Sequence, residues 1–169
     1  MKIRNAKIQD LEAVMKIYAD AACFMKENGN PNQWKNGYPS LDLVRGDIEE
    51  SNLYVCVEKD DILGVFYYKY AEDECYKKIY EGEWKNNLPY GVIHRIAVAE
   101  NAHGMGVSRF CFDFAFDKCH NLKIDTHKDN KVMQKALSKN MFEVCGKIYL
   151  RNGEERIAYQ KSGDKYIKK

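Results

Sequence analysis

The stretch Ile96-Ala-Val-Ala-Glu-Asn-Ala-His-Gly-Met-Gly-Val-Ser108 is the most informative part of the 169-residue sequence. An apolar strand predicted over 92–98 runs into Gly104-Met105-Gly106, where a helix is predicted to begin. The first amide groups of a helix have no intrahelical partner, and glycine lets the backbone approach a ligand closely. The junction is therefore a candidate phosphate site, although two glycines can equally make only a tight strand-to-helix turn.

Patterns on either side of this junction predict alternating strands and helices. Helices are expected over 11–29, 40–50, 106–118 and 130–140, and strands over 2–4, 53–58, 62–68, 92–98, 122–126, 142–150 and 156–160. The strand–helix–strand run from 92 to 126 indicates a parallel crossover, whereas the short turns at 59–61 and 151–154 indicate antiparallel hairpins. The sequence therefore predicts an α/β fold with a mixed sheet. In the last helix, the residues expected to face inward are Val132, Met133, Ala136 and Leu137.

The composition indicates one folded domain spanning 1–169, with 45% hydrophobic and 12% aromatic residues. The 27 basic and 25 acidic residues nearly cancel, so no field suited to nucleic acid is expected. The four basic residues Lys161, Lys165, Lys168 and Lys169 are expected to form a solvated chain end.

The sequence also lacks the signals of membrane, metal and nucleotide sites. No window approaches the ~18 apolar residues that a membrane span needs. Six scattered cysteines without a C-x-x-C pair suit a reducing compartment, so a cytoplasmic location is predicted. With no H-x-x-x-H spacing either, no metal site is expected. Neither G-x-G-x-x-G nor Gly-Lys-Ser/Thr occurs, which argues against a Rossmann or P-loop site.

The element order and the loop from Asn101 to Gly106 resemble the GNAT superfamily of N-acetyltransferases. In that family the acyl-CoA site is a strand that ends in an R/Q-x-x-G-x-G/A loop followed by a helix. Here both glycines are kept, while Asn101 stands where the family usually has Arg or Gln. The resemblance implies the GNAT fold, a central mixed and mostly antiparallel sheet flanked by helices, with acetyl-CoA as cofactor.

The same resemblance implies which residues contact coenzyme A. The pyrophosphate is expected to take N–H groups from 103–108, and the pantetheine arm is expected to pair with the edge of 96–98. The implied cofactor residues in this stretch are Ile96, Ala97, Val98, Asn101, His103, Gly104, Met105, Gly106, Val107 and Ser108.

A second family signature is matched by the residues from Asp129 to Gly146. Asn130 matches the family asparagine that contacts coenzyme A, and Phe142 matches the aromatic residue that packs beside it. Met141 stands where the family usually has Gly. Leu137 stands where many members carry the tyrosine that protonates the leaving thiolate, so that acid is missing from its expected place.

The N-terminal half carries a narrower resemblance, in Phe24-Met-x-x-x-Gly29-Asn30-x-x-Gln33-Trp34-x-x-Gly37-Tyr38-Pro39. This pattern resembles a subgroup of bacterial GNAT proteins with a GNxxQW loop. In GNAT proteins this segment borders the acceptor pocket, which makes Gln33, Trp34 and Tyr38 candidate substrate-binding residues. A hydrophobic plug with a hydrogen-bonded amide is an equally good interpretation of Gln33 and Trp34.

Three residues are candidate general bases for deprotonating an amine. His94 lies on the 92–98 strand, and histidine titrates close to neutral pH. By strand alternation it is expected to share a face with Ile96, and a half-buried structural histidine is the competing interpretation. Glu81 and Glu83 are the rival bases, because aromatic neighbours can raise a carboxyl pKa by desolvation, although a solvated loop explains them as well.

The resemblance implies direct attack of a primary amine on the thioester, with the Val98 amide polarising its carbonyl and no covalent enzyme intermediate. The acceptor is expected to be a small molecule or a peptide, and the chain can act alone or as a homodimer. The alternative is a catalytically silent acyl-CoA-binding module, which the substitutions at Leu137 and Asn101 favour.

Overall fold

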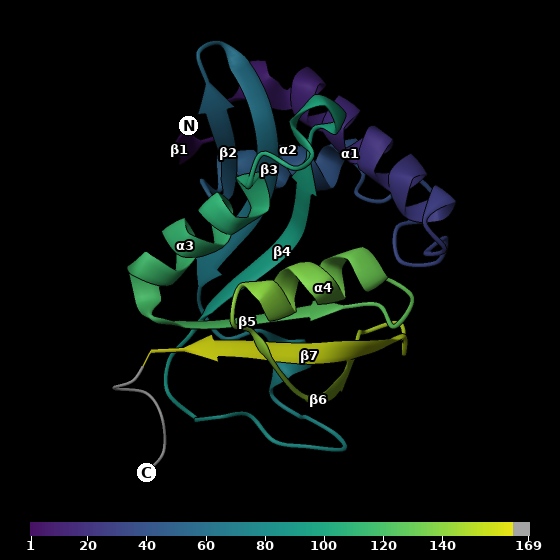
Figure 1. The fold of residues 1–169 in the computed structure, drawn as a ribbon, viewed down its shortest axis with the longest axis vertical. Coiled ribbons are helices and arrows are strands. Elements are labelled where there is room, and N and C mark those ends of the chain that lie inside the picture. Colours follow the sequence, from purple (N-terminus) through teal and green to yellow (C-terminus); the bar gives the residue numbers. More distant parts are fainter. Residues whose placement is uncertain (164–169) are drawn as a thin grey trace.

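The computed structural model describes residues 1–163, which are built on one seven-stranded sheet (Figure 1). Every neighbouring pair of strands is antiparallel except β4 and β5, which confirms a mixed, mostly antiparallel sheet. In spatial order the strands are β1 (Lys2–Asn5), β2 (Leu53–Glu58), β3 (Asp61–Tyr70), β4 (Gly91–Val98), β5 (Asn121–Thr126), β7 (Glu155–Ser162) and β6 (Glu143–Tyr149).

Four α-helices flank this sheet: α1 (Leu11–Glu27), α2 (Leu41–Glu49), α3 (Val107–Cys119) and α4 (Lys131–Lys139). In Figure 1, α3 and α4 lie in front of the sheet and α2 lies behind β3 and β4. Two of the helices begin where a side chain caps them, since Ser40 Oγ accepts the Leu43 N–H and Asn130 Oδ1 accepts the Met133 N–H. None of the helices in residues 1–163 is long and apolar enough to cross a membrane.

β4 and β5 separate soon after they meet. Their parallel pairing is confined to Gly91 with Leu122 and Val92 with Lys123, and beyond these pairs the two strands diverge (Figure 1). The helix between them, α3, makes the parallel crossover that the sequence predicts. As a result, the β5-facing edge of 93–98 has no strand paired to it, and its backbone groups are available to a ligand.

A β-bulge at Arg95 changes which side chains of β4 share a face. The register with β3 shifts there, and Arg95 has a φ of 50°. Ile93 and Ile96 consequently both belong to the main core, although strict alternation would place them on opposite faces. His94 instead lies beside the rings of Tyr67 and Tyr76. The expectation that His94 shares a face with Ile96 is therefore wrong, because the bulge adds one residue between the two positions.

The connection between β3 and β4 covers the other part of the sheet with a second apolar cluster. Its residues are Tyr76, Trp84, Tyr90, Val92, Cys145, Ile148 and Ala158. Lys161 is not part of a solvated chain end, because it lies in β7 with only 6% of its surface exposed and its Nζ 4.5 Å from the Phe116 ring centre. The other three lysines of that predicted tail lie outside the described residues.

Candidate active site

A cavity of about 470 Å³ lies where β4 runs into α3, bordered by α1 and α4. We call it the glycine-turn cavity. Its lining includes most of the residues that the sequence assigned to coenzyme A: Ile96, Ala97, Val98, His103, Gly104, Gly106, Val107, Ser108 and Asn130. Val132 of α4 is half exposed and also lines this cavity, so it does not face the core as expected, whereas Leu137 is fully buried.

The two glycines of the turn leave open space in front of α3. Gly104 and Gly106 have φ values of 81° and 79°, which favour glycine. A Cβ atom built at either position would meet no atom within 4 Å. Gly106 is also the N-cap of α3 and supplies no side chain to the helix amides. The turn therefore fits an anionic group such as a phosphate, which the free amides and the helix dipole would bind.

Not every amide of the predicted phosphate loop is free. The His103 N–H donates to the Glu100 carbonyl at 3.3 Å, and the Met105 N–H donates to the Ala102 carbonyl at 3.2 Å. The prediction that all of 103–108 contribute is therefore too broad. The backbone amides that remain for an anion are those of Gly104, Gly106, Val107 and Ser108.

Three residues assigned to the cofactor do not line this cavity. Asn101 is exposed within a single 3₁₀ turn (Glu100–Ala102), and Met105 is 47% exposed on the outer side of the loop. Phe142 is buried and packs its ring 5.2 Å from that of Phe112, inside the main core. These positions support the fold around the cavity and do not form its wall.

A second cavity of about 410 Å³ contains the candidate base and the candidate substrate residues. We call it the His94 cavity, and its lining includes His94, Gln33, Trp34 and Tyr38. Four residues line both this cavity and the glycine-turn cavity: Met25, Ile96, Asn130 and Met133. The two cavities therefore adjoin one another along the free edge of β4.

His94 is held by a carboxylate from the connection after β3. Its Nε2 lies 2.8 Å from Asp73 Oδ2, and Asp73 Oδ1 accepts the Cys75 N–H at 2.8 Å. Burial opposes ionisation of Asp73, but the hydrogen bonds from His94 and Cys75 lower its pKa overall. An ionised carboxylate only accepts hydrogen bonds, so the imidazole carries its proton on Nε2. Among residues 1–163, Nδ1 of His94 has no partner.

The rival bases do not reach either cavity. Glu81 and Glu83 are exposed and line neither space, and Glu81 forms an ion pair with Lys147 at 3.0 Å. His94 is the one of the three candidate bases that the structure brings to the cavities.

A chain of amides forms the boundary between the two cavities. Gln33 Oε1 accepts hydrogen bonds from Asn130 Nδ2 at 2.9 Å and from Asn30 Nδ2 at 3.0 Å. Asn130 cannot turn over, because its Oδ1 accepts the Met133 N–H as the cap of α4. Trp34 packs its ring 5.5 Å from the ring of Tyr18. Gln33 and Trp34 are thus partly structural, and they also line the His94 cavity.

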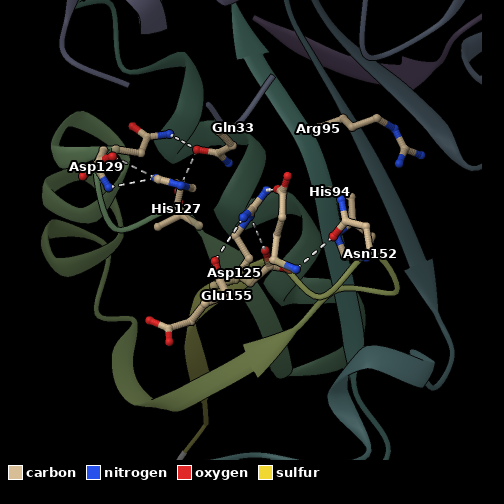
Figure 2. Close-up of polar contacts among 12 residues, drawn as sticks. Gln33, His94, Arg95, Asp125, His127, Asp129, Asn152 and Glu155 are labelled. Atoms are coloured by element: carbon tan, nitrogen blue, oxygen red, sulfur yellow. Dashed lines mark hydrogen bonds and ion pairs between the residues drawn. The ribbon is translucent and has the colours of Figure 1, made fainter. Parts of the chain in front are cut away.

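Charged side chains on the β7 side of the His94 cavity are paired with one another (Figure 2). Arg156 is buried, with its NH2 2.9 Å from Glu154 Oε2 and its Nε 3.9 Å from Asp125 Oδ1. Asp125 also accepts the Tyr76 hydroxyl at 2.7 Å, and Glu154 pairs with Lys35 at 3.1 Å. Within residues 1–163 no group of three potential ligands is arranged to hold a metal ion.

At the bulge, Arg95 is held on both sides of its guanidinium. Its NH2 lies 2.6 Å from Asp47 Oδ2, its Cζ lies 4.7 Å from the Tyr67 ring centre, and its NH1 lies 3.4 Å from the Tyr38 hydroxyl. Burial raises the pKa of Asp47, although the neighbouring Arg95 opposes that effect. These contacts fix the bulge and bring Tyr38 to the cavity wall.

The fold is shared with solved acetyltransferase structures. An acetyltransferase of the GNAT family from Streptococcus agalactiae superposes with a TM-score of 0.88 at 29% identity, covering 96% of this chain and 95% of that one. The chain has the GNAT fold. A putative acetyltransferase from Staphylococcus aureus superposes with a TM-score of 0.70 at 25% identity, covering 96% of this chain and 99% of that one. A ribosomal-protein-alanine N-acetyltransferase from Brucella melitensis superposes with a TM-score of 0.67 at 19% identity, covering 96% of this chain and 100% of that one.

By sequence, the chain matches no protein-family model and no curated protein. The structural relationships support a general acetyltransferase activity. Four residues of the site were not predicted: Asp73, Asp125, Asn152 and Arg156. No sequence motif assigns any of the four to a site, and only their position in the fold brings them to the His94 cavity or, for Asp73, to His94 itself.

Proposed function

We propose that the protein is an acyl-CoA-dependent N-acetyltransferase that transfers an acetyl or similar small acyl group to a primary amine by direct attack. One observation carries this proposal: the glycine-turn cavity and the His94 cavity adjoin along Ile96, beside the free edge of β4. One cavity suits a long phosphorylated cofactor, and the other holds a candidate base. Two reactants held in adjoining spaces react as if at very high local concentration.

The glycine-turn cavity has the groups that coenzyme A requires. The open turn at Gly104 and Gly106 would hold the pyrophosphate, and the unpaired edge of β4 would hold the pantetheine arm. Because the Ala99 N–H donates to the Leu63 carbonyl on the β3 side, the Val98 N–H points to the opposite, free edge. Bound acetyl-CoA would supply the activated acyl carbonyl, and the Val98 N–H would donate to its oxygen.

His94 is the proposed general base. With its proton on Nε2, held by Asp73, it presents the lone pair of Nδ1 to the amine, directly or through one water. An ammonium has no lone pair, so removing this proton is what makes the acceptor nucleophilic. Leu137 is fully buried, so no side chain at the usual tyrosine position protonates the departing sulfur. All six cysteines are unpaired, which supports a reducing, cytoplasmic location.

Acetyl-CoA turnover with a panel of amines tests the proposal. We expect release of free thiol that depends on both acetyl-CoA and amine, together with an N-acetylated product in the mass spectrum. Binding of CoA by calorimetry without turnover of any amine would instead favour the silent binding module. Absence of both binding and turnover would contradict the cofactor assignment as well.

A further inference from the structure

The carboxylates of the His94 cavity are already neutralised by the protein. Asp125 accepts the Tyr76 hydroxyl at 2.7 Å, and Arg156 lies between Asp125 and Glu154. Lys35 provides a second cation for Glu154 at 3.1 Å. A substrate that carries several positive charges would therefore find no unpaired carboxylate in this cavity, and its extra charges would lose hydration without gaining an ion pair.

The free groups of the cavity include two amide donors. Asn130 is fixed by its helix cap, so its Nδ2 must donate to Gln33 Oε1. That contact fixes Gln33 in turn and leaves its Nε2 without a partner among the described residues. Asn152 is fixed in the same way, because its Oδ1 accepts the Glu154 N–H at 3.0 Å, and its Nδ2 has no partner within residues 1–163.

These donors surround the same space as the proposed base. Gln33, Asn152 and His94 all line the His94 cavity, and in Figure 2 Asn152 lies beside His94 while Gln33 lies apart from both. The guanidinium of Arg95 points away from Gln33 in this view. The cavity thus offers Nδ1 of His94 as a hydrogen-bond acceptor, together with uncommitted amide donors.

We propose that the acceptor is an α-amine with an adjacent carbonyl or carboxylate group, that is, an amino acid or the N-terminus of a peptide. This inference rests on the proposed acetyltransferase function. The amine would donate to His94 Nδ1, and its carbonyl oxygen would accept from Gln33 Nε2, with Asn152 as a second donor. Starting from the ammonium form, one proton passes to His94 Nδ1. The amine nitrogen then forms the new C–N bond, the thioester C–S bond breaks, and the second proton lost by the nitrogen goes to the departing thiolate, which leaves as the free thiol.

The first test compares amines that differ only in the carbonyl group. Alanine, leucine and phenylalanine, their amides, and ethylamine, isoamylamine and phenethylamine are assayed as acceptors, with spermidine as a polyamine. We expect kcat/KM to be at least about tenfold higher when the carbonyl is present, as for loss of one hydrogen bond in a desolvated site. Comparison of amino acids with amides shows whether the carboxylate or the neutral carbonyl is preferred. A wild-type preference for spermidine or for the plain amines would overturn the inference.

The Gln33→Glu variant tests the contribution of the Gln33 Nε2 donor. Glutamate keeps an oxygen for Asn130 and replaces Nε2 by a second acceptor, so the variant should lose the preference for carbonyl-bearing amines. A carbonyl also lowers the basicity of the neighbouring amine, but this effect is the same for the wild type and for Gln33→Glu. A difference in substrate preference between the two enzymes therefore reports the contact with the Gln33 amide alone. Asn32→Ala, an exposed change on the same loop, is the control and should keep the preference.

A binding measurement separates this inference from the proposed function. In the protein without cofactor, the side-chain amide signal of Gln33 in a ¹⁵N NMR spectrum should shift on adding alaninamide and stay in place with ethylamine. An unchanged substrate preference in Gln33→Glu, or equal shifts with both amines, would refute the acceptor class while leaving acetyl transfer intact. No turnover of any amine by the wild type would refute the proposed function itself.

Discussion

Asp73 Oδ2 lies 2.8 Å from His94 Nε2, while the other carboxylate oxygen of Asp73 is held by the Cys75 N–H. The carboxylate therefore acts as a fixed acceptor that selects one tautomer of the imidazole. It touches no reacting atom in our account, so Asp73 is a positioning residue.

The Asp73→Asn variant should reverse the histidine tautomer. The oxygen of the new Asn side chain would still accept the hydrogen bond from the Cys75 N–H. The NH₂ group of that Asn would then point to His94 Nε2 and donate to it, which moves the ring proton to Nδ1. We expect turnover to fall at least about tenfold while CoA affinity is kept. The ¹⁵N chemical shifts of His94 report the tautomer directly. Retention of the Nε2–H form in the variant, at wild-type rate, would show that Asp73 does not position the base.

Replacing His94 by alanine should lower turnover by ~10²–10⁴, the usual contribution of a general base, with CoA affinity nearly intact. The rise of kcat/KM with pH that the wild type should show would also move or vanish. His120→Asn is a matched control, because His120 lines neither cavity and has a φ of 52° that asparagine tolerates. If His94→Ala lost stability but kept the wild-type rate and pH profile, His94 would be a structural histidine and the amine would be deprotonated by solvent.

Gly104→Val should weaken CoA binding at least about tenfold by calorimetry, because its Cβ would project into the open turn where the pyrophosphate is expected. Gly153→Val is the control for backbone strain. Gly153 has a similar φ of 83° and equally open surroundings, but it lies in the β6–β7 turn. Both variants should lose stability, and only Gly104→Val should lose CoA affinity. Equal CoA affinity in the two folded variants would place the phosphates elsewhere.

Lys123 predicts a pH dependence of stability outside the active site. Its Nζ lies 4.0 Å from the Trp84 ring centre and 3.9 Å from that of Tyr90, and desolvation lowers its pKa from 10.5 to about 8. Between these pH values the unfolded chain binds more protons at Lys123, so this residue makes stability rise with pH from about 8 to 10.5. Relative to Lys123→Met, the wild type should gain up to about 3 kcal/mol in free energy of unfolding over this window. Urea unfolding curves of the wild type and Lys123→Met at pH 7 and pH 10 measure this gain. If the difference in free energy of unfolding between the two proteins were the same at both pH values, Lys123 would not be desolvated.

The fold could be predicted from sequence because its signals are local. Ser40 and Asn130 cap the helices that follow them, and the Asn152-Gly153 turn joins β6 to β7 as expected. The glycine-turn cavity was predictable for the same reason, since Gly104 and Gly106 lie directly between β4 and α3.

The acceptor side was predictable only in part. His94 and the GNxxQW loop carry visible signals, but the bulge at Arg95 depends on Asp47 and Tyr67, which are 48 and 28 residues from it in no recognisable pattern. Asp73 lies in a connection without a motif, and its role follows from the hydrogen bond to His94 alone. Aromatic neighbours in the sequence favour Glu81 and Glu83, but Trp84 packs into the second apolar cluster and Tyr80 packs against Tyr149.

A crystal structure of the protein with coenzyme A tests most directly that the two cavities form one acetyl-transfer site. We predict the pyrophosphate at the amides of Gly104, Gly106, Val107 and Ser108, the pantetheine arm along the free edge of β4, and the sulfur at the boundary near Ile96, facing the His94 cavity. Coenzyme A bound elsewhere, or with its sulfur directed away from the His94 cavity, would contradict the account.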